Sequence, residues 1–196
     1  EHLTFLGDEG RDVRIVRDLL RGNLVFIGPM TSIGNMYLGP LYYYMMAPAL
    51  FLAGGSPVGP AVMVALLMTA TIYFTWLIAR NWFGKYPALI AAFLFAISPV
   101  AIIYSRSSWN PNPMPFFALV SILAIYEVWQ RHRFVLLSVA ALSLAAGLQM
   151  HYLGLLLIPS LGTFLLLTLR STGADPVGRT KFIRQTLLAV VVFALI

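Results

Sequence analysis

The chain alternates long apolar runs with short polar connections, a pattern typical of a protein that crosses a membrane several times. No formal charge occurs in the runs 22–79, 86–105 and 134–169. Because about 20 apolar residues suffice for a helix to cross the hydrocarbon core, these runs predict an all-α fold, a polytopic bundle of transmembrane helices. The spans are expected near residues 58–79, 86–105, 114–130, 134–150, 152–169 and 186–196, the last of them truncated.

The run 134–169 is too long for one span. A single helix over this run would measure about 54 Å, against about 30 Å for the hydrocarbon core. We therefore predict two shorter helices that are broken near Gln149, Met150 and His151.

The N-terminal part predicts helices that lie at the membrane surface. Residues 9–21 have apolar side chains on one arc of a helix and charged side chains on the opposite arc, which favours a helix in the membrane interface. Residues 28–35 predict an ordered loop, and the tyrosine-rich segment 36–53 predicts a helix at or dipping into the interface. We therefore assign residues 1–57 to an outer loop with juxtamembrane helices, and residues 58–196 to the transmembrane bundle.

The positive charges predict which side of the membrane each connection faces. Eight Lys and Arg side chains lie in the connections 80–85, 131–133 and 170–184, which the positive-inside rule assigns to the cytoplasm. Residues 1–57, 106–112 and 149–151 then share the outer face. If segment 36–53 crossed the membrane, residues 1–35 would lie inside and no common outer site would form.

The composition agrees with a membrane protein. The chain is 60% hydrophobic and only 10% charged, with a mean hydropathy of +0.84, whereas a soluble domain is about 25% charged. Because most of the excess positive charge lies in short connections, the net charge of +6 does not indicate nucleic-acid binding. The absence of cysteine fits an oxidising or a reducing compartment equally well.

The densest group of acids, Asp8, Glu9 and Asp12, stands just before the longest charge-free run. A paired Asp8 and Glu9 at the edge of a membrane bundle makes these two residues the candidates for catalysis. A purely structural interpretation stays open, in which Asp8 caps the following helix and Glu9 favours its first turn.

Two further polar patches, residues 105–112 and 149–151, converge on the same predicted face. Polar side chains near the hydrocarbon core are costly and are therefore candidates for function. Each also has a structural interpretation. Trp109 can be an interface anchor, Arg106 can reach to headgroups, Asn110 and Asn112 can be turn residues, and Gln149 and His151 can bond backbone groups freed at the helix break.

Several segments together resemble a known family. The acidic pair is followed by the predicted interfacial helix, by Gly-Pro-Leu-Tyr-Tyr-Tyr at 39–44, by Gly59-Pro60, and by Ala-Arg-Asn-Trp-Phe-Gly at 79–84. The chain resembles the polytopic glycosyltransferases of the C-type fold that use polyprenyl-phosphate sugars. That class includes the family 39-like protein O-mannosyltransferases and lipid A aminoarabinose transferases, and the stretch 104–117 resembles its bacterial members.

The resemblance implies an inverting transfer of a sugar from a polyprenyl-phosphate donor to an acceptor hydroxyl on a lipid, glycan or protein. Asp8 would be the general base and Glu9 would support it. No Asp-x-Asp occurs, so no catalytic metal and no cofactor are expected. The residues expected to contact substrate are Tyr43, Arg11, Arg106, Asn110, Asn112 and His151.

The resemblance is incomplete at particular positions. Some relatives carry Asp where this chain has Asn112, which leaves the donor sugar open, and a cation that many relatives carry near Pro40 is missing. The chain is interpreted as an internal piece without the family's first span and C-terminal half, and is expected to be inactive alone.

The protein is expected in the inner or plasma membrane, with its site on the periplasmic or extracellular face, in contact with membrane lipids. The alternative from another class is a transporter or lipid-translocating module, which broken helices also suit. An inactive scaffold subunit is a third interpretation.

Overall fold

The computed structural model describes residues 7–172 and 175–196, and in this part of the chain the fold is all-α, as predicted. The single β feature among these residues is an isolated antiparallel bridge between Met30 and Tyr37. The chain divides into two compact units. The first holds the described residues up to Phe116 together with Gln149–His151, and the second holds Phe117–Leu148 and Tyr152–Ile196.

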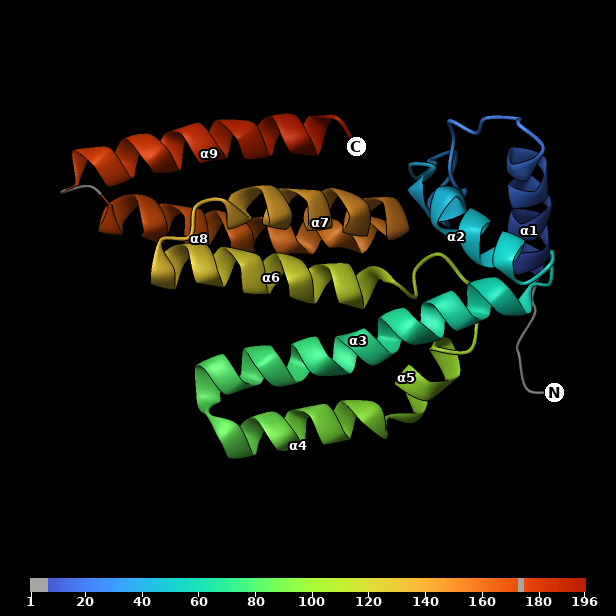
Figure 1. Ribbon diagram of the computed structural model, residues 1–196, viewed down its shortest axis with the longest axis horizontal. Helices are drawn as coiled ribbons and strands as arrows, with labels where there is room; N and C mark the ends of the chain where they lie inside the picture. Colours follow the sequence, from blue (N-terminus) through green and yellow to red (C-terminus); the bar gives the residue numbers. More distant parts are fainter. Residues whose placement is uncertain (1–6, 173–174) are drawn as a thin grey trace. The chain divides into compact units, whose positions relative to one another are not determined.

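The first unit begins with two helices that pack on each other, α1 (Gly7–Leu20) and α2 (Leu41–Leu52) (Figure 1). The amphipathic pattern correctly predicted α1, whose buried apolar residues are Val13 and Val16. In α2, helix formation begins after Pro40, so residues 36–40 lie outside the helix that was predicted from residue 36. The buried side chains of α2 are Tyr42, Tyr43, Met46, Ala47 and Leu50.

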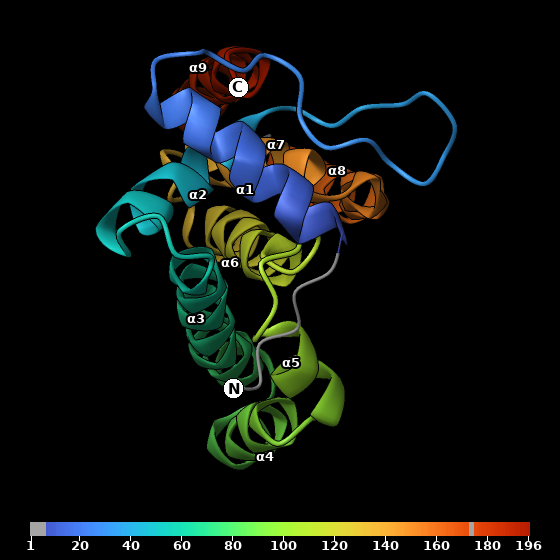
Figure 2. The same ribbon diagram turned by 90° about the vertical axis from the view of Figure 1, so that its right-hand side faces the viewer.

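A hairpin connects α1 to α2, where an ordered loop was predicted. Its arms are held by backbone hydrogen bonds from Gly28 N to Leu38 O at 2.9 Å, from Leu38 N to Pro29 O at 3.0 Å, and from Thr31 N to Met36 O at 2.9 Å. Gly28 allows the close approach of these arms, because a Cβ on Gly28 would overlap the backbone of Gly39. Figure 2 shows this hairpin extending beyond α1 and α2.

The helix α3 (Val58–Phe83) and the helix α4 (Lys85–Ala96) form an antiparallel pair. The connection predicted at 80–85 is wrong in extent, because α3 continues to Phe83 and only Gly84, with a φ of 89°, makes the turn. A glycine adopts this positive φ without the steric cost that a Cβ would add.

The span predicted at 86–105 is not one helix. It is broken after α4, and a short helix, α5 (Pro99–Tyr104), follows. Ser98 causes the break together with Pro99: the Ser98 side chain accepts from the amide of Ala101, and proline sets the backbone angle of a first helical turn.

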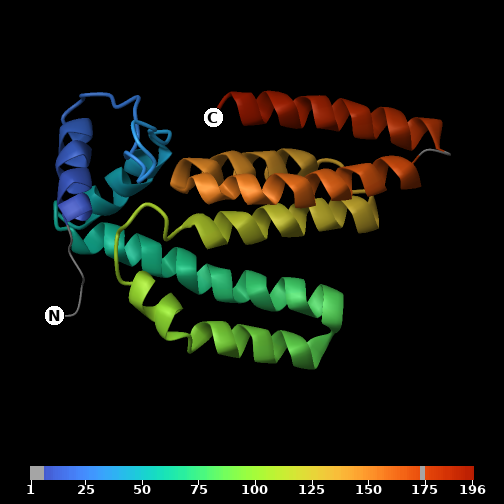
Figure 3. The ribbon, with the colours of Figure 1, turned by 180° about the vertical axis from the view of Figure 1, so that it is seen from behind.

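Within this unit, α1 and α2 lie at the N-terminal end of α3, and Gly84 lies at its other end (Figures 1 and 3). Its 26 residues make α3 about 39 Å long, which exceeds the roughly 30 Å of the hydrocarbon core. The N-terminal helices and the basic Arg80–Lys85 end of α3 are therefore separated by more than the thickness of that core.

The second unit packs four helices side by side, as Figure 3 shows. They are α6 (Met114–Arg131), whose first turn belongs to the first unit, α7 (Leu136–Met150), α8 (Leu157–Ser171), which follows the short 3-10 helix η1 (Tyr152–Leu156), and α9 (Pro176–Ala194). Its core joins residues from all four helices, and Ser121 Oγ donates to Ala140 O at 3.0 Å between α6 and α7. The buried core residues are Ala124, Ile125, Val128, Leu137, Ala140, Leu161, Phe182 and Ala189.

The predicted break near residues 149–151 is confirmed, because α7 ends at Met150 and η1 begins at Tyr152. The basic connection predicted over 170–184 is wrong, since α9 already begins at Pro176. Asp175 starts that helix by accepting from Val177 N at 3.0 Å.

Two segments, Val58–Phe83 and Tyr152–Ser171, are long and apolar enough to cross a membrane by length and composition.

The close backbone contact at Gly28 gives a prediction about the hairpin. Gly28→Ala adds a methyl group where the Gly39 backbone stands, and overpacking of this kind costs roughly 1–3 kcal/mol. We expect a lower thermal midpoint for the full-length protein in detergent. Gly162→Ala is the control, because an added Cβ at Gly162 in α8 meets nothing within 4 Å. Equal midpoints for the two variants would show that the hairpin does not depend on this contact.

Candidate active site

The first two turns of α1 carry three carboxylates with very different exposure. The Asp8 side chain is 56% exposed, whereas Glu9 is 1% and Asp12 is 0% exposed. Asp8 lies inside the first turn of α1, so it is not the capping residue that the structural interpretation made it. Of these three acids, Asp8 is the one that a substrate can reach.

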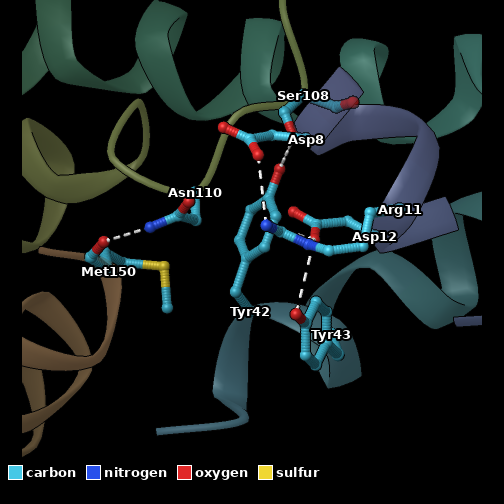
Figure 4. Close-up of polar contacts among 8 residues, drawn as sticks. All are labelled: Asp8, Arg11, Asp12, Tyr42, Tyr43, Ser108, Asn110 and Met150. Atoms are coloured by element: carbon cyan, nitrogen blue, oxygen red, sulfur yellow. Dashed lines mark hydrogen bonds and ion pairs between the residues drawn. The ribbon is translucent and has the colours of Figure 1, made fainter. Parts of the chain in front are cut away.

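Arg11 connects the exposed acid to a buried one. Its Nη1 donates to Asp8 Oδ1 at 3.1 Å, while its Nε and Nη2 donate to Asp12 Oδ1 at 3.0 and 2.8 Å (Figure 4). The spacing of Asp8, Arg11 and Asp12 places the three side chains on one face of the helix. Both carboxylates are therefore held by one guanidinium.

Asp12 is a buried carboxylate in a polar cluster. Tyr43 of α2 donates its hydroxyl to Asp12 Oδ1 at 3.3 Å, whereas Asp12 Oδ2 is buried without a hydrogen-bond partner among the described residues. Burial raises the pKa of Asp12, and the hydrogen bond and charge of Arg11 act in the opposite direction. The stability of the ionised form of Asp12 therefore depends on Arg11.

Two adjacent tyrosines of α2 bond different parts of the site. Burial raises the pKa of both Tyr42 and Tyr43 well above the usual value, so both hydroxyls are protonated and available as donors. Tyr42 donates to the backbone carbonyl of Ser108, whereas Tyr43 donates to Asp12. α2 therefore supports α1 and the loop after α5 together.

Glu9 connects α1 to the loop after α5. Ser107 Oγ donates to Glu9 Oε1 at 2.6 Å, and both side chains are buried. A hydrogen bond between a hydroxyl and a carboxylate is among the stronger ones in proteins. Glu9 therefore holds the two segments together.

The loop 105–112 is organised by two buried asparagines. Asn112 Nδ2 donates to Tyr104 O at 2.8 Å and to Ser107 O at 2.9 Å, while Asn110 Nδ2 donates to Met150 O at 2.8 Å. Asn110 and Asn112 were predicted to bind substrate, but their side-chain amide groups already donate hydrogen bonds to backbone carbonyls.

Two exposed side chains of this loop stand beside the asparagines. Arg106 is exposed, and its side chain has no hydrogen bond or ion pair within the described part of the chain. Trp109 is also exposed, and its ring lies 6.3 Å from that of Tyr104. Arg106 therefore keeps its full donor capacity for an anion.

The helix break brings two more predicted residues into the first unit. Gln149 Oε1 accepts from Leu41 N at 3.0 Å, at the first amide of α2. His151 is half-buried, and burial lowers its pKa. Gln149 therefore satisfies a free helix-end amide, as the structural interpretation expected, although the amide belongs to α2.

The structure thus brings Asp8, Glu9, Arg11 and Tyr43 into one cluster and adds Asp12, which the sequence reasoning missed as a site residue. Its spacing was a signal, because Asp12 follows Asp8 by one helical turn and falls next to Arg11. Across residues 7–172 and 175–196, no three His, Asp or Glu side chains converge in a way that could hold a metal ion.

A groove of about 640 Å³ runs along the charged face of α1. It contains three arginines and no acid, so it favours an anionic ligand beside the carboxylate cluster. Its lining residues are Gly7, Gly10, Arg11, Val13, Arg14, Ile15, Arg17 and Pro57.

Comparison with known proteins gives one family. Residues 38–196 match the family described as dolichyl-phosphate-mannose-protein mannosyltransferase. The comparison with curated proteins and the comparison with solved structures returned no match. The match includes α2, the loop 105–112 and Gln149–His151, while α1 precedes it.

The match covers most of the chain and confirms the resemblance inferred from the sequence. It favours a transferase over the transporter and scaffold interpretations, because the matched family is one of sugar-transferring enzymes. The chain belongs to the dolichyl-phosphate-mannose-protein mannosyltransferase family and is part of a membrane glycosyltransferase that draws on a lipid-linked donor.

Proposed function

We propose that the parent protein transfers a sugar from a polyprenyl-phosphate donor to an acceptor hydroxyl, with Asp8 as the general base and inversion at the anomeric carbon. The observation that carries this proposal is the exposure of Asp8 next to two buried acids. A hydroxyl is a poor nucleophile at neutral pH, so a positioned carboxylate that takes its proton accelerates the attack. Direct attack in one displacement inverts the sugar carbon.

Burial separates the roles of the two predicted catalytic acids. Glu9 is occupied by Ser107 and closed to solvent, so its role is to hold the loop against α1. Asp8 bonds Arg11 through Oδ1 and is open to an acceptor. The proposal therefore keeps Asp8 as the base and Glu9 as the supporting residue.

Arg11 is the residue that orients Asp8. Since Arg11 is itself anchored by two hydrogen bonds to buried Asp12, the carboxylate of Asp8 is tied through Arg11 to the interior of the unit. Tyr43 adds a donor to Asp12 from the neighbouring helix. A base held in this way loses less entropy when the acceptor binds.

The departing phosphate needs positive charge or hydrogen-bond donors as its own charge develops. Arg106 is proposed to bind this phosphate. Its exposed guanidinium has no hydrogen-bond or ion-pair partner in the described chain, and Arg106 comes shortly after the end of the apolar helix α5. Asn110 and Asn112 shape the loop that carries Arg106, and His151 is retained as a candidate contact. The proposal invokes no metal ion and no cofactor.

The site is proposed to face the outside of an inner or plasma membrane, where lipid, glycan or protein acceptors are available. The support comes from the first unit, in which the acids of α1 and the basic Arg80–Lys85 end lie at opposite ends of α3 (Figure 1). The positive-inside rule then assigns the Arg80–Lys85 end to the cytoplasm.

Single-cysteine labelling checks this sidedness, because these 196 residues hold no native cysteine and any cysteine elsewhere in the full-length protein can be replaced by serine. In intact cells, a membrane-impermeant maleimide should label full-length protein carrying Asp18→Cys. It should label Lys85→Cys only after the membrane is opened. Labelling of both variants in intact cells, or of Lys85→Cys alone, would contradict the proposed orientation.

Asp8→Asn is the direct test of the base. Asn keeps the shape of the side chain but accepts no proton, so transfer from a polyprenyl-phosphate sugar by the full-length protein should fall roughly 10²–10⁴-fold. Asp18→Asn is the matched control on the same helix, where Asp18 pairs with exposed Arg21, and it should be nearly silent.

Glu9→Gln completes the comparison. Gln keeps an oxygen that accepts from Ser107, so this variant should retain most of its turnover. If Glu9→Gln loses turnover as deeply as expected for Asp8→Asn, while Asp8→Asn stays near the parental rate, the two roles are reversed.

Arg11→Ala tests the support of the base and has a pH dependence. The variant leaves Asp12 buried without its cation, at a cost of about 1–3 kcal/mol. Burial is then opposed by the hydrogen bond from Tyr43 and no longer by Arg11, and it holds the pKa of folded Asp12 further above its unfolded value. Stability is therefore present at low pH and is lost as the pH rises through that raised pKa, so the deficit in thermal midpoint should shrink on acidification.

The double variant Arg11→Ala with Asp12→Asn separates stability from chemistry. Removing both partners of a buried pair costs far less than removing one, so the thermal midpoint at neutral pH should largely recover. Transfer should stay low in both variants because Asp8 has lost its orienting partner. Recovery of transfer together with stability would show that Arg11 matters only for folding.

A further inference from the structure

The hairpin between α1 and α2 presents apolar side chains outward. Within residues 23–38, which carry no charge, seven large hydrophobic side chains are exposed, and Phe26 reaches 78%. An exposed apolar patch of this kind marks a surface for a membrane or another apolar partner. The exposed side chains are Leu24, Phe26, Ile27, Met30, Ile33, Met36 and Tyr37.

The hairpin is an ordered element. Its arms are joined by backbone hydrogen bonds between Gly28 and Leu38 and between Thr31 and Met36. Thr31 Oγ1 accepts from Ile33 N at 3.2 Å at the tip, and Tyr44 donates its hydroxyl to Val25 O at 3.0 Å at the base. The backbone polar groups in these bonds are satisfied within the element while the apolar side chains point away from it, as an apolar surrounding requires.

The position of the hairpin favours a bilayer as that surrounding. Along the axis of α3, the hairpin lies at the level of the first turns of this helix but set apart from it to one side, whereas α1 lies at its end (Figures 1 and 2). Because α3 is long and apolar enough to cross a membrane, its first turns mark the depth at which the hydrocarbon begins. The helix α1, which carries the charged residues, lies at the N-terminal end of α3 (Figure 1).

We propose that residues 24–37 insert into the bilayer leaflet that borders the site and hold the platform of α1 and α2 against the membrane. The composition fits the interfacial layer, where aromatic rings sit at headgroup level and aliphatic chains reach the acyl region. This inference concerns the membrane contact and does not depend on the chemistry at Asp8.

The test uses the full-length protein in liposomes with a small fluorophore on a single cysteine, placed by Ile33→Cys. Two quenchers report the surroundings: phospholipids with brominated acyl chains, and iodide in the buffer. Leu66→Cys, on an exposed position in the first half of α3, is the control for lipid contact. Asp18→Cys, on the polar face of α1, is the control for water contact.

Insertion predicts that the fluorophore at position 33 is quenched by brominated lipid as at position 66 and is shielded from iodide relative to position 18. Quenching by iodide to the extent seen at position 18 overturns the proposal and leaves the hairpin in water. Protection from both quenchers also overturns it, because a protein surface would then cover the hairpin.

Discussion

The pairing of Arg11 with buried Asp12 is the interaction on which the candidate site depends. A carboxylate with no solvent exposure is costly unless a cation and further donors accompany it, and Arg11 and Tyr43 supply both. Because Arg11 also bonds Asp8, the burial of one acid fixes the position of the other. The arrangement therefore couples the packing of α1 on α2 to the geometry of an exposed carboxylate.

Hydrophobic patterning predicted the helices that have continuous apolar runs and the break within 134–169, because span length and helix rise are properties of short segments. Hydrophobic patterning failed to predict helix boundaries that depend on one or two residues. Ser98 and Pro99 interrupt an uncharged run without changing its hydropathy, and Gly84 allows a turn so short that α3 keeps Arg80. Capping by Asp175 likewise starts α9 inside a segment whose charges predicted a loop.

The candidate site was predictable in its membership and less so in its roles. Asp8, Glu9 and the loop 105–112 were identified because each is polar next to apolar sequence, Tyr43 was named with the family resemblance, and Asp12 was missed. Their burial could not be predicted, since the difference between Asp8 and Glu9 arises from contacts with Ser107, 98 positions away in the chain. The asparagines were identified for the same reason, although their amides bond backbone carbonyls close by and at Met150.

The interruption between α4 and α5 affects the lipid around the loop that bears Arg106. At 1.5 Å per residue the 12 residues of α4 cover only about 18 Å, well short of the roughly 30 Å of the hydrocarbon core. At the break the carbonyls of Phe93 and Phe95 accept from Ile97 N and Ser98 N, and a backbone carbonyl there without such a partner would draw in water or headgroups. The proposed phosphate contact at Arg106 would therefore follow a pass that is interrupted within the membrane, so that a lipid-borne phosphate would have less hydrocarbon to displace there than beside an unbroken helix.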